Sequence, residues 1–174
     1  MQNYFDVFKL KTNYSIDLNL LENNYQSLMQ KLHPDNFSAM ADMAKRIANQ
    51  KSSELNHAYT TLLSPISRAK HLLELNSYTI DFESERVGPE YIMHQFELRE
   101  EFAELEEKNS DDAYNVFLSN LENEYNALLN SLVSLFVNKE HSKVKDLLLH
   151  LKFLERLIEK VKHNTSIYVK ELSL

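Results

Sequence analysis

The stretch Lys31-Leu32-His33-Pro34-Asp35-Asn36-Phe37 separates two segments whose apolar residues recur with the spacing of an α-helix. In the segment before it, which begins at the predicted N-cap Asp17, the recurring residues are Leu21, Tyr25, Leu28 and Leu32. In the segment after it, they are Ile47, Leu55, Ala58 and Leu62. Pro34 has no N–H to donate and disfavours helical geometry at His33, so the first helix must end there. The sequence therefore predicts an antiparallel pair of helices, at residues 17–32 and about 40–63, joined by an exposed polar connection.

The composition of the 174 residues is typical of an all-helical protein. One glycine and three prolines leave few residues for the tight turns of β-hairpins, whereas Leu, Glu, Lys, Asn and Ala dominate. The absence of cysteine excludes disulfides and thiolate metal sites, and it is compatible with a reducing compartment. We therefore expect an all-α fold that is held together by packing alone.

Charge and hydropathy argue against nucleic acid and membrane as partners. The net charge of −7 is opposite to the clustered positive face that phosphate binding needs. No long uncharged apolar run is present, and the N-terminus lacks the basic and then apolar pattern of a secretion signal. A cytoplasmic protein is expected.

The apolar spacing predicts further helices on both sides of the central pair. Residues 4–10 are expected to form a short packing helix, and Ser64 can cap another helix that starts at Pro65. The helical period fades between Asn76 and Gly88, which indicates a domain junction. We expect a first domain at residues 1–75, a linker at 76–88 and a second domain at 89–174. The second domain should be an antiparallel bundle of three helices, at 89–108, 111–138 and 140–171.

The tripeptide His33-Pro34-Asp35 can be interpreted in two ways. Alone, it is most simply a helix stop, because proline terminates a helix and histidine suits the dipole at a helix C-terminus. Its surroundings favour a second interpretation, since the tripeptide lies between the paired helices and the other motifs follow in a fixed order. These motifs are Tyr4-Phe5-Asp6-Val7-Phe8, Asn56-His57-Ala58-Tyr59-Thr60-Thr61-Leu62 and Pro65-Ile66-Ser67-Arg68-Ala69-Lys70-His71-Leu72-Leu73. Together, residues 1–75 resemble a J domain, and more narrowly that of the HscB family, the co-chaperones of iron–sulfur cluster assembly.

The helix at residues 89–108 carries more apolar residues than one buried stripe needs. One face, which we assign to the bundle core, holds Val87, Tyr91, Leu98, Phe102 and Leu105. Ile92, Met93 and Phe96 point elsewhere, and Phe153 lies off the stripe of the last helix. Such a patch, rimmed by charge, is typical of a binding site, although packing against the J-like domain or the linker is equally consistent with the spacing.

A second resemblance covers this patch. The runs Ile92-Met93-His94-Gln95-Phe96, Glu97-Leu98-Arg99-Glu100-Glu101 and Leu151-Lys152-Phe153-Leu154 are similar to the C-terminal region of the same family. There, matching positions hold the cluster scaffold protein IscU. The resemblance therefore implies a set of scaffold-binding residues in this chain, namely Ile92, Met93, Phe96, Glu97, Arg99, Glu100, Glu104 and Phe153.

The resemblance implies an adaptor without catalysis of its own. Its second domain would deliver IscU to an HscA/DnaK-type chaperone, whose ATPase it would stimulate through His33, Pro34 and Asp35, with Lys31 adding electrostatic steering. The Asp35 carboxylate can pair with an arginine of the chaperone, and Pro34 keeps the connection rigid. Two alternatives stay open. One is a J-domain co-chaperone for another client, and the other is a homo-oligomer that uses the apolar patch on itself, whereas the adaptor is expected to be a monomer or a weak dimer.

An enzyme is not expected. Helical bundles host carboxylate-bridged metal sites, but these need two Glu-x-x-His pairs, and only Glu54-Leu55-Asn56-His57 has that spacing. No catalytic motif is present, and a single glycine leaves no glycine-rich loop. The other histidines beyond the tripeptide lack ligand spacing, so we expect no metal site and no cofactor; they are His71, His94, His141, His150 and His163.

Overall fold

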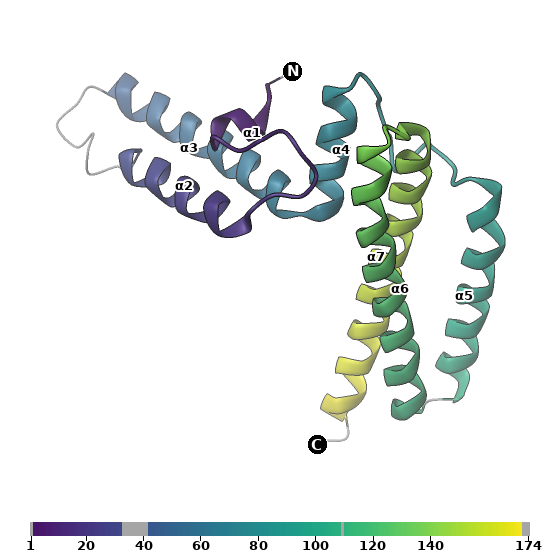
Figure 1. The fold of residues 1–174 in the computed structure, drawn as a ribbon. Helices are drawn as coiled ribbons and strands as arrows, with labels where there is room; N and C mark the ends of the chain where they lie inside the picture. The colour runs from purple at the N-terminus through teal and green to yellow at the C-terminus, as the bar shows by residue number, and fades with distance from the viewer. Residues whose placement is uncertain (1, 33–41, 109, 172–174) are drawn as a thin grey trace. The chain divides into compact units, whose positions relative to one another are not determined.

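The computed structural model describes residues 2–32, 42–108 and 110–171, and within these ranges it contains α-helices and no strand (Figure 1). Packing divides the chain into two compact units, unit 1 at residues 1–79 and unit 2 at residues 80–174. Unit 1 contains α1 (Tyr4–Val7), α2 (Leu18–Lys31), α3 (Asp42–Leu63) and α4 (Pro65–Leu75). Unit 2 contains α5 (Pro89–Lys108), α6 (Asp111–Val137) and α7 (His141–Glu171).

The predicted helices are present, with ends within about three residues of the expected positions. The predicted caps are confirmed as well. The Asp17 carboxylate accepts the N–H groups of Asn19 and Leu20 at the start of α2, and Ser64 caps α4 with Pro65 in the first turn. These caps satisfy backbone donors that have no partner inside the helix.

One residue of the apolar stripe predicted for the second long helix, Ile47, does not lie in the core. Ile47 is 48% exposed, whereas its neighbour Ala48 is buried. Ala48, Leu55 and Leu62 follow each other at steps of seven residues, so they stay on one side of α3. Ile47 lies one residue earlier, about 100° around the helix, and is carried away from the core.

Two tyrosines hold the antiparallel pair α2 and α3 together. The hydroxyl of Tyr25 on α2 donates to the side-chain oxygen of Asn56 on α3 at 2.8 Å. The hydroxyl of Tyr59 on α3 donates to the carboxylate of Glu22 on α2, and the two tyrosine rings stack with centroids 4.1 Å apart. The motif residues Asn56 and Tyr59 therefore fix the register of the pair.

The motif that begins at Pro65 anchors the end of α3. The Arg68 side chain is buried, and its guanidinium donates to the backbone oxygens of Leu62 at 2.8 Å, Leu63 at 3.3 Å and Tyr14 at 2.9 Å. Carbonyls at a helix C-terminus have no partner inside the helix. Arg68 supplies that partner and joins α3, α4 and the segment before α2.

Unit 2 is a three-helix arrangement in which α6 and α7 lie side by side along most of their length and α5 packs on α7 (Figure 1). Its core contains apolar residues of all three helices: Leu98, Phe102, Leu105, Tyr114, Phe117, Leu121, Leu154, Leu157 and Val161. The segment before α5 packs on this unit as well, because the Glu85 carboxylate forms an ion pair with Lys145 of α7. Part of the expected linker thus belongs to unit 2.

Three helices end at a residue in the left-handed conformation. These residues are Lys9, Ser77 and Lys139, with φ angles of 54°, 65° and 58°. After α6, the N–H of Glu140 donates to the carbonyl of Leu135 at 2.9 Å, and the N–H of Lys139 donates to that of Phe136 at 3.2 Å. This is the Schellman arrangement, in which glycine is the usual left-handed residue. Here side chains occupy the position, at a cost of about 1–2 kcal/mol each.

Among the described residues, no helix combines the length and the hydrophobicity that a membrane span requires.

Candidate functional site

Helix α5 has two apolar faces, as its spacing predicts, although Val87 of the expected core face precedes the helix and Tyr91 is only half-buried. Its core face buries Leu98, Phe102 and Leu105. On another face, the apolar side chains of Ile92, Met93 and Phe96 are 38%, 65% and 54% exposed. Steps of three and four residues place exposed glutamates beside them on the helix surface. We call this surface the α5 patch, and it consists of Ile92, Met93, Phe96, Glu97, Glu100 and Glu104.

Phe153 of α7, which the spacing places off the buried stripe of its helix, is half-buried and has close neighbours. The ring packs against the core of unit 2 and stacks on the ring of His150, with centroids 6.1 Å apart. The guanidinium of Arg99 on α5 lies 5.2 Å from the centre of the Phe153 ring. The Phe153 side chain therefore points away from the buried stripe of α7 and toward α5. Its contact with Arg99 covers part of the ring.

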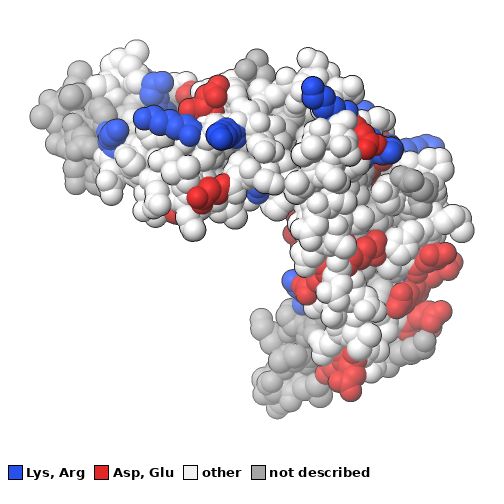
Figure 2. All heavy atoms as spheres, viewed as in Figure 1, with Lys and Arg blue, Asp and Glu red and all other residues white. Residues whose placement is uncertain are grey.

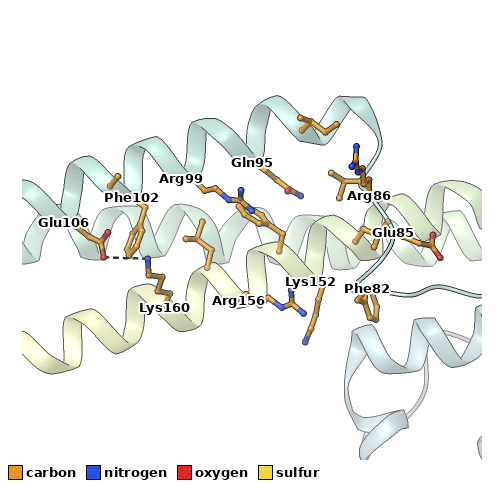
Figure 3. Close-up of a pocket in the computed structure, with 16 residues that line it drawn as sticks. Phe82, Glu85, Arg86, Gln95, Arg99, Phe102, Glu106, Lys152, Arg156 and Lys160 are labelled. Carbon is orange, nitrogen blue, oxygen red and sulfur yellow. Dashed lines mark ion pairs between the residues drawn. The ribbon is translucent and has the colours of Figure 1, made fainter.

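Arg99 and Phe153 line a groove between α5, α7 and the segment before α5, with a volume of about 620 Å³ (Figure 3). Ile92 of the α5 patch lies at the same groove. Two acidic residues, Glu85 and Glu106, are outnumbered there by five cationic ones, which are Arg86, Arg99, Lys152, Arg156 and Lys160. Lys160 forms an ion pair with Glu106 at 3.8 Å (Figure 3). The groove is therefore predominantly basic.

The binding residues predicted from the sequence include only some of the residues that line this groove. Of its basic residues they contain Arg99, and they omit those that α7 contributes. Lys152, Arg156 and Lys160 follow each other at steps of four residues, which places them on one side of a helix. That spacing is visible in the sequence, and it is the signal that indicates a basic stripe on α7.

The surface of unit 2 thus carries two charged regions of opposite sign next to the exposed apolar residues of α5. Glutamates gather on the outer side of α5, where Figure 2 shows acidic side chains close together. The basic residues lie in the groove between α5 and α7. Because phosphate backbones need a continuous positive surface, this mixture of charges fits a protein partner better than a nucleic acid.

The expected chaperone-binding residues lie mostly outside the described residues. His33, Pro34 and Asp35 fall in the range 33–41, whereas Lys31 is described and is exposed at the end of α2. Helix α3 adds the exposed cations Lys45 and Arg46 near its start. The candidates from sequence omit these two, although they follow the tripeptide by only ten residues. Exposed positive charges therefore occur on both helices that flank the tripeptide.

Among the described residues, one group of side chains could hold a metal ion. His94 of α5, Glu124 of α6 and His150 of α7 bring their ligand atoms within 4.8 Å of one another, next to the α5 patch. The hydrogen bond to Glu124 raises the pKa of His94 above its usual value, whereas burial lowers the pKa of His150. This group was not expected from sequence, because its residues come from three separate helices.

The comparisons with known proteins decide the family. A family model described as "HSCB C-terminal oligomerisation domain" matches residues 87–162. A co-chaperone protein HscB homolog of Vibrio vulnificus is 32% identical over 157 residues, which cover 89% of this chain and 92% of that protein. This chain belongs to the HscB family of co-chaperones. A homolog of Shewanella loihica is 31% identical over 160 residues, with the same coverage of both proteins.

Solved HscB structures confirm the predicted fold class. Human co-chaperone HscB is 25% identical and superimposes with a TM-score of 0.85. The superposition covers 100% of this chain and 84% of the human chain. HscB of Vibrio cholerae is 27% identical, with a TM-score of 0.82 over 99% of this chain and 100% of that one. The fold is therefore an all-α J domain followed by a C-terminal helical domain.

Membership also decides the functional class. HscB proteins are co-chaperones rather than enzymes, so the sequence-based expectation of a protein without catalysis is confirmed. The resemblance to the co-chaperones of iron–sulfur cluster assembly is confirmed at the level of the family.

Proposed function

We propose that this chain binds the iron–sulfur scaffold protein IscU through the α5 patch and the adjoining groove and presents it to an HscA/DnaK-type chaperone. In this proposal His33, Pro34, Asp35 and Lys31 contact the chaperone and stimulate its ATPase. The observation that carries it is the row of exposed apolar residues on α5 in a member of the HscB family. We propose that the protein carries out this role in the cytoplasm.

The exposed apolar residues supply the binding energy in this proposal. Ile92, Met93 and Phe96 stand in contact with water in the free protein, so covering them with a partner removes apolar surface from solvent. Met93 is unbranched and adapts to an irregular partner surface. Apolar anchors at the centre of an interface, surrounded by a polar border, commonly dominate the affinity.

The charged border sets the orientation of the scaffold. Glu97, Glu100 and Glu104 lie on the α5 side, and Arg99 is already held over the Phe153 ring. A cation over an aromatic face is attracted by the ring, so the Arg99 side chain loses little freedom when a partner binds. Charge pairs at such a border mainly determine which partner binds and how fast.

The chaperone contact uses the other unit. The Asp35 carboxylate would accept a charge-assisted hydrogen bond from an arginine of the chaperone, and Pro34 would limit the entropy lost on binding. Exposed cations on the flanking helices, Lys31, Lys45 and Arg46, would attract an acidic chaperone surface.

The ATPase rate of the chaperone tests both contacts. It is measured with this protein alone, with the scaffold alone and with both, and we expect the combined rate to exceed the sum of the separate stimulations. Asp35→Asn should abolish stimulation and leave scaffold binding unchanged. Stimulation that is indifferent to the scaffold would support a J-domain protein for another client and refute the role of the α5 patch.

Scaffold affinity tests the patch directly. Met93→Ala and Phe96→Ala should each weaken binding about tenfold, because each removes apolar area that only the complex covers. Neither should lower the melting temperature, since both side chains are already exposed. Val116→Ala is the matched control, because Val116 is 62% exposed on α6 and lies outside the patch. A control variant that loses as much affinity as Phe96→Ala would contradict the assignment.

Self-association is a second candidate for the α5 patch. The family model that matches residues 87–162 is described as an oligomerisation domain. Light scattering at micromolar concentration should give a monomer or a weak dimer if the patch serves the scaffold. A stable oligomer that Phe96→Ala dissociates would instead assign the patch to contacts between copies of the chain.

A further inference from the structure

The side chains of His94, Glu124 and His150 converge at one point in unit 2. Nε2 of His94 lies 2.9 Å and 3.0 Å from the two carboxylate oxygens of Glu124, and Nε2 of His150 lies 3.1 Å from one of them. All three ligand atoms are within 4.8 Å of one another. We propose that these residues form a binding site for a divalent first-row transition metal ion, with a protein ligand set of two histidines and one glutamate.

The spacing of the ligand atoms suits such an ion. Zinc binds histidine nitrogen and carboxylate oxygen at about 2.0–2.2 Å, so two ligands in a tetrahedral site lie roughly 3.3–3.5 Å apart. The nitrogen to oxygen distances here are only a few tenths of an ångström shorter. All three ligand atoms are already within 4.8 Å of one another, so side-chain rotations would bring them to the distances of a tetrahedral site.

Both histidines also have, near Nδ1, a side chain that can serve as the outer partner of a metal-binding histidine. A histidine that binds metal through Nε2 usually donates its Nδ1–H to a carboxylate or an amide oxygen. Nδ1 of His94 lies 3.6 Å from the Glu97 carboxylate, and Nδ1 of His150 lies 3.3 Å from the amide nitrogen of Gln95. The amide oxygen and nitrogen of Gln95 exchange places by rotation, so this side chain can accept the proton. With the remaining proton of each ring held at Nδ1, a bound ion would displace the Nε2 protons that the Glu124 carboxylate accepts in the hydrogen bonds above.

The environment gives the site a closed side and an open side. His150 is 1% exposed, and its ring stacks on Tyr91 with centroids 4.4 Å apart. The side chain of His94 is 40% exposed, so an ion can enter from the α5 surface. Three protein ligands with access for a fourth are typical of open zinc sites, in which water or a partner group completes the coordination. The Glu124 carboxylate supplies the negative charge that a divalent cation requires.

The ligands come from all three helices of the bundle, so a bound ion would link α5 to α6 and α7. Because the ion binds the assembled bundle and not the unfolded chain, it would stabilise unit 2. This inference concerns metal binding by the chain alone, and it holds whether or not the α5 patch binds a scaffold.

Metal titration of the full chain, after removal of metal with a chelator, is the test. Zn²⁺ should bind with one ion per chain and a micromolar or tighter dissociation constant, and Co²⁺ should give the visible absorption of a four- or five-coordinate ion. His94→Gln should weaken binding at least tenfold, since it removes one ligand at a partly exposed position. His163→Gln is the matched control, because His163 is an exposed histidine of α7 outside the group.

A second measurement locates the ion. Zn²⁺ should slow amide hydrogen exchange in α5 of the wild-type chain, and this effect should be absent in His94→Gln. Circular dichroism confirms that the variant is folded. Binding only in the millimolar range, binding that His94→Gln leaves unchanged, or equal losses in both variants would overturn the proposal and leave the three residues as a hydrogen-bonded network.

Discussion

At the scale of single residues, the structure explains why the motif that starts at Pro65 contains an arginine. The resemblance places Arg68 in a family pattern but does not explain it. In the structure the buried guanidinium binds three backbone carbonyls, and an arginine is suited to this because it presents five donors in a rigid fork. The sequence cannot show this, because one of the acceptors belongs to Tyr14, which lies 54 residues earlier.

His71 connects the same motif to the start of the chain. Its side chain is 3% exposed, its ring stacks on Tyr4, and its Nε2 accepts the backbone N–H of Tyr4 at 3.1 Å. Burial lowers the pKa of His71 below its usual value. Only the neutral ring has a lone pair to accept that hydrogen, so protonation would remove the contact.

The stability of unit 1 should therefore depend on pH through His71. Its pKa is lower in the folded than in the unfolded chain, so the unfolded state binds more protons as the pH falls below about 6.5. Between pH 7.5 and pH 5.5 we expect a loss of about 1 kcal/mol through this group. Urea denaturation, followed by the NMR signals of α1 and α4, measures the loss. His71→Gln keeps an acceptor without titrating, and an equally steep dependence in that variant would contradict the assignment.

The candidate sites differ in how far single residues could be predicted. The exposure of Ile92, Met93 and Phe96 follows from helical spacing, because the spacing within one helix shows which apolar residues lie off its buried face. The convergence of His94 with Glu124 and His150 does not, since it depends on the register of three helices. Glu124 is 30 residues from His94 and 26 from His150, and no local pattern fixes such distances.

At the scale of helices, the sequence predicts where they begin better than how they end. The starts of α2 and α4 follow from Asp17 and from the Ser64 and Pro65 pair, which satisfy backbone donors locally. The ends after α1, α4 and α6 carry no glycine signal, because Lys9, Ser77 and Lys139 occupy the left-handed position. The only glycine, Gly88, has a negative φ, so it marks a boundary in composition rather than a backbone requirement.

Replacing the left-handed residue after α6 should stabilise unit 2. Lys139→Gly removes the Cβ that clashes at positive φ, and part of the gain is offset by the greater freedom of glycine in the unfolded chain. We expect an increase of about 0.5–1 kcal/mol in the free energy of unfolding, measured by thermal or urea denaturation. Lys139→Ala is the control, because it retains the Cβ and should be no more stable than the wild type. Equal stability of the two variants would show that the backbone is not strained there.

At the scale of the whole molecule, each unit has a core of its own, and the composition already indicates the all-α class. The boundary between the units is harder to derive. Loss of helical period suggests a linker at residues 76–88, but Glu85 pairs with Lys145 and Arg86 lines the groove. Irregular segments pack through single side chains, and such contacts leave no period in the sequence.

Fragments of the chain test this division. Residues 80–174 should fold alone, giving a helical circular dichroism spectrum and cooperative unfolding, because they contain a complete core. Residues 89–174 should be less stable by about 1 kcal/mol, since they lack the ion pair between Glu85 and Lys145 and the groove contacts of the preceding segment. Equal stability of the two fragments would show that residues 80–88 act only as a linker.

The left-handed helix ends also bear on how this protein can change over evolutionary time. A chain close to its stability threshold is lost when substitutions cost it one or two kcal/mol. Lys9, Ser77 and Lys139 offer three positions, distributed over both units and outside the α5 patch, at which glycine would raise that margin. A lineage that adopted them could accept destabilising substitutions in the patch and groove, so its recognition surface could diversify while the helices stayed in place.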